Sequence, residues 1–237
     1  MQNNPTSNNP LEMQTMGSEF DGGFAQYCVA KAKESFPINC DWSDIELASI
    51  PISYSTAEGM LCRADVEKET ILITGASGGV GSAAIQLAKI RGATIIAQCS
   101  PDKASFLKDL GADQTVNRSD NLVSVLGKNS VDVVFDLVGG SSWPQLLDII
   151  KPGGKYVTSG AIAGPIVDLD LRSLYLKDLT LYGSTVNDPF VFENVIRYIE
   201  EGQIKPLVAQ SFPLKEIHKA QKVFMEKKFI GKIVLIP

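Results

Sequence analysis

The chain has 237 residues, which is enough for one large domain or two small ones. Its 44% hydrophobic and 21% charged residues are typical of a soluble globular protein, and its net charge of −5 without any basic block argues against a nucleic-acid partner. No apolar run reaches the roughly 20 residues that cross a bilayer, and the polar start lacks the apolar core of a signal peptide, so we expect a cytoplasmic protein with no membrane partner.

The cysteines are widely spaced along the chain, and no two of them form a CxxC pair. They are Cys28, Cys40, Cys62 and Cys99. This spacing supports neither a disulfide framework nor a structural zinc site. We therefore expect reduced cysteines.

The N-terminal part is the least regular by pattern. Residues 1–17 are rich in Asn, Gln, Ser and Thr, which predicts a disordered or loosely attached segment. Residues 17–29 are typical of a turn followed by a short strand. Residues 41–50 fit a helix capped by Asp41 or Ser43, and a further helix is expected to begin with Ser55 or Thr56 as its cap.

From residue 70 onward, apolar β-branched runs alternate with helical patterns. The runs span residues 71–74, 94–97, 131–137, 155–158 and 179–182, with a weaker run at 114–117. This alternation predicts an α/β fold of the Rossmann type, with a doubly wound parallel sheet covered on both faces. Two amphipathic helices, 190–201 and 214–228, and a closing strand, 232–236, follow the sheet.

A glycine-rich turn lies between the first of these strands and the helix after it. Gly75, Gly78 and Gly81 give the spacing GxxGxxG, whereas in the GxGxxG spacing the first glycine is replaced by Ala76. A strand, a glycine turn and a helix form the layout of a dinucleotide site, in which the backbone approaches the pyrophosphate at a helix N-terminus. The alternative is a tight turn that serves packing alone.

The end of the second strand bears on which dinucleotide is bound. An NAD site usually has an acidic residue there that binds the ribose 2′-hydroxyl, but this strand runs into Gln98 and Ser100. Ser100, Lys103 and Arg118 can instead contact a 2′-phosphate, so the pattern favours NADP(H) over NAD(H). Alternatively, Ser100 only caps a helix and the two basic residues are solvated surface charges.

Taken together, these and other motifs resemble the medium-chain dehydrogenase/reductase superfamily, in particular its zinc-type alcohol dehydrogenase-like and quinone oxidoreductase-like branches. The motifs that carry the resemblance are residues 21–27, 54–57, 75–81, 86–89, 111–113, 136–140, 152–154 and 231–234. Each motif is unspecific alone, but they occur in the same order over residues 17–237. The resemblance implies an enzyme that transfers a hydride from a nicotinamide cofactor to a carbonyl or an activated alkene, such as a quinone or an enone.

The resemblance also implies roles for matching positions. The implied cofactor-binding residues are Thr56, Gly75, Ser77, Gly78, Gly79, Val80, Gly81, Ser100, Lys103, Arg118, Val138, Ser159, Gly160, Ala161, Ile162 and Lys232. When no zinc is present, the charged substrate oxygen needs hydrogen-bond donors, and the candidates are the nicotinamide ribose hydroxyl and the hydroxyls of Thr56 and Tyr54, which are the proposed catalytic residues.

The chain also departs from the family pattern. The Asp-Gly-Gly-Phe motif normally lies near the end of a GroES-like catalytic domain, but here it begins at Asp21. We therefore expect most of that domain to be missing, with residues 18–50 as its remnant, residues 51–187 as the NADP-binding Rossmann domain, and residues 188–237 returning to the catalytic domain. No cysteine stands near residues 51–53, and the single histidine, His218, lies in an amphipathic helix, so we expect no bound zinc.

The leading hypothesis is an NADPH-dependent oxidoreductase acting on a small-molecule substrate. The alternatives are a catalytically silent NADP(H)-binding module and an α/β scaffold that binds no nucleotide. We also expect a homodimer formed through the edge strand Leu179–Tyr182. Apolar surface is expected to be exposed near the aromatic residues that face the missing domain. These residues are Phe20, Phe24, Phe190 and Phe192.

Overall fold

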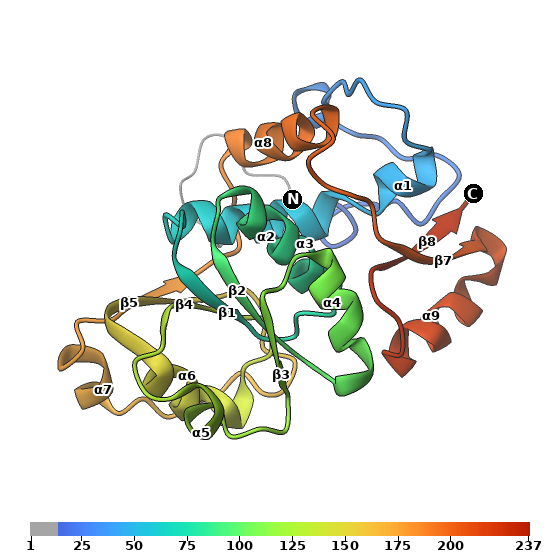
Figure 1. The fold of residues 1–237 in the computed structure, drawn as a ribbon. Helices are drawn as coiled ribbons and strands as arrows, with labels where there is room; N and C mark the ends of the chain where they lie inside the picture. Colours follow the sequence, from blue (N-terminus) through green and yellow to red (C-terminus); the bar gives the residue numbers. More distant parts are fainter. Residues whose placement is uncertain (1–13) are drawn as a thin grey trace. The chain divides into compact units, whose positions relative to one another are not determined.

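Figure 1 shows the computed structural model of the protein, which describes residues 14–237. Backbone contacts divide the chain into two compact units. The first consists of the residues up to Ser55 together with Thr185–Pro237, and the second is Thr56–Ser184. The disorder predicted for residues 1–13 lies outside the described residues. Just after them, Met16 and Phe20 pair across a turn.

The second unit is built on a parallel sheet of six strands. The strands are β1 Thr70–Ile73, β2 Thr94–Cys99, β3 Gln114–Asn117, β4 Val131–Asp136, β5 Ile150–Thr158 and β6 Thr180–Gly183. Their order across the sheet is β3-β2-β1-β4-β5-β6, and all neighbours are parallel. The chain starts in the middle of the sheet and winds outward in both directions, so the predicted Rossmann-type fold is confirmed.

Helices cover both faces of this sheet (Figure 1). They are α2 Pro51–Arg63, which enters this unit at Thr56, α3 Gly79–Ile90, α4 Ala104–Leu110, α5 Leu122–Leu126, α6 Trp143–Ile149 and α7 Leu171–Tyr175, with short 3-10 turns η3 Pro101–Lys103 and η4 Gly140–Ser142. Helix α3 packs on β1 and β2, while α5 and α6 pack on a core that includes Leu72 and Val134. Consecutive residues of β1 are fully buried because both faces are covered, which explains the unbroken apolar runs of the sequence.

The first unit contains a smaller sheet and three α-helices within the described residues. Its elements are η2 Ala32–Glu34, α1 Asp44–Ala48, α8 Pro189–Glu200, β7 Val208–Pro213, η5 Leu214–Glu216, α9 Ile217–Glu226 and β8 Lys232–Ile236. Strands β7 and β8 pair in parallel, and α9 connects them and packs on both. Phe36 packs edge-on against Phe192, with ring centroids 5.3 Å apart. Phe24 and Phe190 are exposed as expected, whereas Phe20 and Phe192 are only partly exposed.

Several local predictions are wrong. Helix α2 begins at Pro51, so Ser55 and Thr56 lie inside the helix instead of capping it. Proline is favoured at a first helical position because its fixed φ suits the helix and its missing N–H is not needed there. The Ser55 hydroxyl accordingly bonds back to the Pro51 carbonyl, 2.5 Å away. Residues 23–29 form no strand, and β7 was not predicted.

The N-cap of helix α1 is one of the two residues that the sequence predicts for it. Ser43 is the N-cap of α1, and its side chain accepts a hydrogen bond from the backbone N–H of Glu46. The Glu46 carboxylate in turn accepts from the Ser43 N–H at 2.8 Å, which completes a capping box. No helix in the described part of the chain is long and apolar enough to span a membrane.

Candidate functional site

The glycine turn joins β1 to α3 with very little space around it. Gly75 adopts a φ of +58°, a conformation that residues with a Cβ rarely adopt. A Cβ built on Gly81 would lie 2.5 Å from the Gly75 carbonyl oxygen and 2.6 Å from the Cα of Ala76. The first turn of the helix is therefore pressed directly onto the glycine turn, and only glycine fits at position 81.

The start of α3 is open to solvent. Gly78 is the N-cap of this helix, and it is exposed and offers no side chain to the free N–H groups of the first turn. Ser77, Gly79 and Val80 beside it are partly exposed. The helix dipole places positive potential at the N-terminus of α3, and the backbone N–H groups there are free to donate hydrogen bonds. The glycine turn therefore fits a negatively charged pyrophosphate.

A buried carboxylate lies at the carboxyl end of β4. Asp136 is 0% exposed. It accepts hydrogen bonds from the hydroxyls of Thr74 and Tyr156, both at 2.6 Å, and from the backbone N–H groups of Val138 and Gly139, both at 3.0 Å. Four donors offset the cost of taking a carboxylate out of water.

The Asp136 network ties three adjacent strands together at one edge of the sheet. Thr74 follows β1, Asp136 ends β4 and Tyr156 belongs to β5. Burial raises the pKa of the Tyr156 phenol, and the hydrogen bond to Asp136 raises it further. The phenol therefore stays protonated and acts as a permanent donor, so the network fixes the backbone that follows β1 and β4.

Two loops meet above this network. Gly139 and Gly140 have φ values of +68° and +78°, and a Cβ built on Gly140 would lie 2.7 Å from the Ala163 carbonyl oxygen. The Ala163 N–H donates to the Val138 carbonyl at 2.9 Å. A Cβ on Gly75 would meet Val138 at 3.0 Å. The structure thus brings the glycine turn, the loop after β4 and residues 159–164 to one edge of the sheet.

Of the cofactor candidates in the loop after β5, Ser159 and Gly160 are partly buried, whereas Ala161 and Ile162 are exposed. The Ser159 hydroxyl contacts the Met60 sulfur at 3.4 Å. The Ile162 side chain is among the most exposed apolar groups of the second unit. Ile162 therefore takes no part in the close packing of Ala161, Ala163 and Gly164 on Gly139 and Gly140.

The ends of β2 and β3 lie side by side. The Arg118 N–H donates to the Cys99 carbonyl at 3.0 Å, which brings Arg118 to the end of β2. Gln98 is buried, and Ser100 and Lys103 are partly exposed. The Ser100 hydroxyl bonds to the Asp102 carboxylate and lowers its pKa, and the charges of Lys103 and Arg118 lower it further. The acidic Asp102 side chain thus stands among the three proposed 2′-phosphate contacts.

Both catalytic candidates lie in α2. Tyr54 is buried in the first unit, and its hydroxyl donates to the Lys205 carbonyl at 2.6 Å. Thr56 is the first residue of the second unit and is just buried. Lys232 begins β8 in the first unit, and burial of its ammonium lowers its pKa. Tyr54 and Lys232 thus belong to a different unit from the glycine turn.

A buried ion pair that the sequence did not reveal joins α2 to the end of α3. Arg91 donates to both carboxylate oxygens of Glu58, at 2.8 and 2.7 Å, and the Glu58 side chain is fully buried. Cys62 lies beside the pair. Burial, followed by the negative charge of Glu58, raises the pKa of its thiol to about 11. Cys62 is therefore a protonated packing residue at neutral pH, not a nucleophile.

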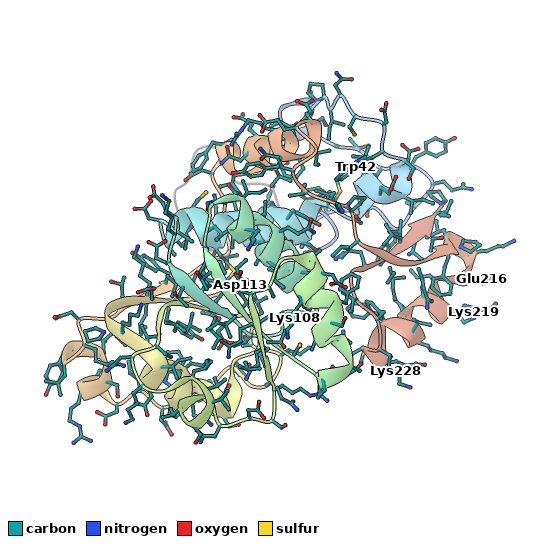
Figure 2. The ribbon with its side chains drawn as sticks, viewed as in Figure 1. Trp42, Lys108, Asp113, Glu216, Lys219 and Lys228 are labelled. Carbon is teal, nitrogen blue, oxygen red and sulfur yellow. The ribbon has the colours of Figure 1, made fainter. Side chains whose placement is uncertain are left out.

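No group of three or more His, Cys, Asp or Glu side chains in residues 14–237 is arranged to hold a metal ion. His218 is exposed on α9, where its neighbours Glu216 and Lys219 form an ion pair at 3.1 Å (Figure 2). The described residues therefore do not fit a zinc site.

Comparisons with known proteins agree with this geometry. The model of the zinc-binding dehydrogenase family matches residues 79–201, from the start of α3 to the end of α8. The 2-haloacrylate reductase of a Burkholderia species is 30% identical over 236 residues, which cover 91% of this chain and 71% of the relative. The chain belongs to this family, within the medium-chain dehydrogenase/reductase superfamily. The family predicted from the sequence motifs is thereby confirmed.

Other members of the family cover the same part of the chain. The acryloyl-coenzyme A reductase of Metallosphaera sedula is 30% identical over 220 residues, 92% of this chain and 66% of that protein. A solved structure from Sinorhizobium meliloti 1021 superposes with a TM-score of 0.90 at 46% identity, covering 94% of this chain and 64% of the other. This chain thus spans about two thirds of the length of these relatives.

Proposed function

We propose that the chain is an NADPH-dependent oxidoreductase of the medium-chain dehydrogenase/reductase type. The observation that carries the proposal is the glycine turn, which leaves no space for a side chain at Gly81 and exposes the helix N-terminus at Gly78. The proposed pyrophosphate contacts are the backbone of Gly75 and of residues 77–81. The nicotinamide, when bound, supplies a hydride, and the protein supplies binding, orientation and electrostatics.

The preference for NADPH rests on charge. Gln98 puts no carboxylate on the strand end, and Lys103 and Arg118 add positive charge close to it. The Asp102 carboxylate lies within the electrostatic range of both cations and reduces this potential. Relatives differ in the cofactor that they use. A 2-octenoyl-CoA carboxylase reductase that is 28% identical was solved with NADP and 2-octenoyl-CoA. An alcohol dehydrogenase of Saccharolobus solfataricus that is 30% identical is NAD-dependent.

The substrate we propose is an alkene conjugated to a carbonyl group. Acryloyl-coenzyme A, 2-haloacrylate and 2-octenoyl-CoA, which appear in the names of three relatives, all share this group. Hydride addition to the β-carbon moves negative charge to the carbonyl oxygen, and a proton from solvent then completes the reduction at the α-carbon. A hydrogen-bond donor at that oxygen lowers the barrier. Thr56 is the better candidate for this donor, because the Tyr54 hydroxyl already donates to Lys205.

Residues that follow β4 and β5 are proposed to hold the nicotinamide end of the cofactor. They are Val138, Ser159, Gly160, Ala161 and Ile162. The Asp136 network supports this assignment, since it fixes the backbone on which Val138 stands. Lys232 is proposed as a further cofactor contact from β8. We also propose the domain limits predicted from the sequence and a homodimer that forms through β6. A cytoplasmic location and independence from zinc belong to the same proposal.

A catalytically silent NADP(H)-binding module is the second candidate function. The observation that favours it is the position of Tyr54, which belongs to a different unit from the glycine turn and already donates its hydroxyl to the Lys205 carbonyl. In this case, the chain binds the nucleotide and reduces no substrate.

A titration followed by a turnover screen on the same sample tests both functions. Binding of NADPH and of NADH is measured by nicotinamide fluorescence. Oxidation of NADPH by 2-enoyl thioesters, enones and quinones is then followed by the loss of absorbance at about 340 nm. We expect NADPH binding and turnover of a 2-enoyl thioester, both abolished by Gly78→Asp, whose carboxylate repels the pyrophosphate. Tight NADPH binding without turnover of any substrate supports the silent module, and absence of binding contradicts both functions.

A further inference from the structure

Positive charge gathers on and around helix α9. Residues 214–228 contain the exposed lysines Lys215, Lys219, Lys222, Lys227 and Lys228. The acidic residues of this segment are Glu216 and Glu226. The whole chain has 22 basic and 27 acidic residues, so the charge of this segment is opposite in sign to the net charge of the chain. A local excess of positive charge on an acidic protein attracts partners of complementary charge.

Three of these lysines lie along one side of the helix. Ala220 is buried, and α9 packs on β7 and β8. Lys215 in η5 and Lys219 and Lys222 in α9 are four and three residues apart, which places them along the side of the helix away from Ala220. Lys219 extends from this side into solvent (Figure 2). These three lysines form a basic row of one cation per helical turn, roughly 10 Å long.

The basic row is only partly neutralised by neighbouring acids. Glu216 lies 3.1 Å from Lys219, and Glu226 lies 3.6 Å from a lysine that follows the helix. Such exposed ion pairs contribute little to stability, so the lysines can exchange partners at low cost. Within the described part of the chain, neither Lys215 nor Lys222 takes part in an ion pair.

Two apolar side chains are exposed at the C-terminal end of the same helix. Phe224 is 49% exposed and Met225 is 72% exposed. Met225 comes three residues after Lys222, so it continues the basic row along the helix. The Lys227 ammonium lies over the Phe224 ring, 3.4 Å from its centroid. Methionine and aromatic side chains are enriched in protein interfaces, so exposed apolar groups beside cations are typical of a docking surface.

Burial and residue type together indicate which anionic partner fits this surface. An acidic membrane is disfavoured, because the apolar side of α9 is already packed on its own sheet and is not free to enter lipid. A nucleic acid is disfavoured, because no arginine, the residue that binds phosphate with two hydrogen bonds, follows Arg197. We propose that the basic row, together with Met225, is a docking surface for an acidic segment of another protein. Carboxylates of that segment pair with the lysines, and an apolar side chain packs on Met225.

Binding of labelled peptides to the full chain tests the proposal. The probe is a fluorescein-labelled peptide of four Glu-Glu-Leu repeats, and the matched control peptide has Ser in place of each Leu. We expect saturable binding of both at low salt, measured by fluorescence anisotropy, with weaker binding as salt screens the exposed lysines. The Leu peptide is expected to bind about three-fold tighter than the Ser peptide, because Met225 covers part of its apolar surface.

Charge reversal separates the basic row from general attraction to lysine. The test variant combines Lys215→Glu, Lys219→Glu and Lys222→Glu. The control variant makes the same change in charge on exposed lysines of the second unit, by Lys68→Glu, Lys108→Glu and Lys128→Glu. We expect the Leu peptide to bind at least about ten-fold more weakly to the test variant and at most about two-fold more weakly to the control variant.

A single substitution tests the apolar contact. Met225→Ser is expected to remove the preference for the Leu peptide and to leave the affinity for the Ser peptide unchanged. Thermal unfolding is measured for every variant to show that it folds. An equal loss of affinity in the two triple variants, or equal affinity of the wild type for the two peptides, overturns the proposal.

Two further measurements examine other occupants. Tighter binding of the wild type to phosphatidylserine vesicles or to a short DNA duplex than to the Leu peptide, at the same salt, overturns the proposal. Sedimentation velocity without peptide is expected to give the same coefficient for the wild type and the test variant. A smaller coefficient for the test variant shows that a second copy of this chain covers the basic row, which also overturns the proposal. None of these measurements depends on nucleotide binding or turnover, so their outcome is independent of the proposed function.

Discussion

Asp136 ends strand β4 and Asp102 follows strand β2 of the same parallel sheet, but Asp136 is fully buried and Asp102 is exposed. Asp136 accepts four hydrogen bonds and acts as part of the scaffold. Asp102 bonds to Ser100 and lies within the electrostatic range of two cations. A buried carboxylate such as Asp136 therefore fixes the backbone through its hydrogen bonds. An exposed carboxylate such as Asp102 mainly changes the local electrostatic potential.

The largest effect is expected from Asp136→Ala. The variant leaves the donors of Thr74, Val138, Gly139 and Tyr156 without their acceptor. At about 1 to 3 kcal/mol for each buried unsatisfied donor, we expect the free energy of unfolding to fall by roughly 4 kcal/mol or more, measured by urea denaturation. Tyr156→Phe, which removes one donor, is expected to cost only about 1 kcal/mol.

Asp102→Asn is the matched change at the exposed aspartate and is expected to leave the free energy of unfolding unchanged. Equal destabilisation by the Asp102 and Asp136 variants contradicts the contrast between a scaffold carboxylate and a surface carboxylate. An Asp136→Ala protein that unfolds at the same urea concentration as the wild type contradicts this contrast as well.

Gly81→Ala is expected to have the next largest effect, and this effect is on cofactor binding. The added methyl group would lie 2.5 Å from the Gly75 carbonyl oxygen, so the helix and the turn must separate. We expect about 1 to 3 kcal/mol of destabilisation and at least ten-fold weaker NADPH binding, measured by denaturation and by calorimetry. Gly23→Ala is the control, since a Cβ there meets no atom within 4 Å. Unchanged NADPH affinity in Gly81→Ala argues against the turn as the nucleotide site.

A smaller effect on affinity is expected at the end of β2. Asp102→Asn removes the negative charge beside Lys103 and Arg118, so NADPH is expected to bind about three-fold tighter at low salt, with NADH unaffected. Lys103→Gln is expected to change NADPH affinity in the opposite direction. If both variants change NADPH and NADH affinity by the same factor, these side chains do not contact a 2′-phosphate.

The smallest expected effect concerns Cys62, whose pKa is raised to about 11 by burial and then by Glu58. Because the folded protein holds the thiol proton more tightly than the unfolded chain, stability is expected to fall as pH rises from about 9 toward 11. Cys62→Ala should remove this part of the pH dependence. In alkylation with iodoacetamide at pH 8, followed by mass spectrometry, the exposed Cys28 is expected to react much faster than Cys62. Equal rates contradict the buried, protonated thiol.

Local patterns explain why much of the sheet was predictable. Strands β1 to β6 overlap the apolar, β-branched runs, although β5 begins at Ile150, ahead of the run at 155–158, and α3 begins at Gly79, inside the glycine turn. These features depend on residues close together in the chain. Strand β7 was missed because its sequence has little apolar character and ends in Pro213, and it forms only by pairing with β8.

Contacts over long sequence separations could not be predicted in the same way. The Thr74–Asp136 hydrogen bond joins residues 62 apart, and the Glu58–Arg91 pair joins residues 33 apart. The sequence did contain one signal for the first, namely an aspartate at the end of a strand that is mostly apolar. Asp102 was not counted as the strand-end acid, because it comes only after Pro101, and its contacts with Ser100, Lys103 and Arg118 became clear only from the structure.

Isothermal titration calorimetry of the chain with NADPH and with NADH, at low and at high salt, tests the central claim most directly. The account predicts NADPH binding that is at least about ten-fold tighter than NADH binding at low salt, with a margin that narrows as salt screens Lys103 and Arg118. Equal affinity for the two cofactors at both salt concentrations, or no heat of binding with either, would contradict it.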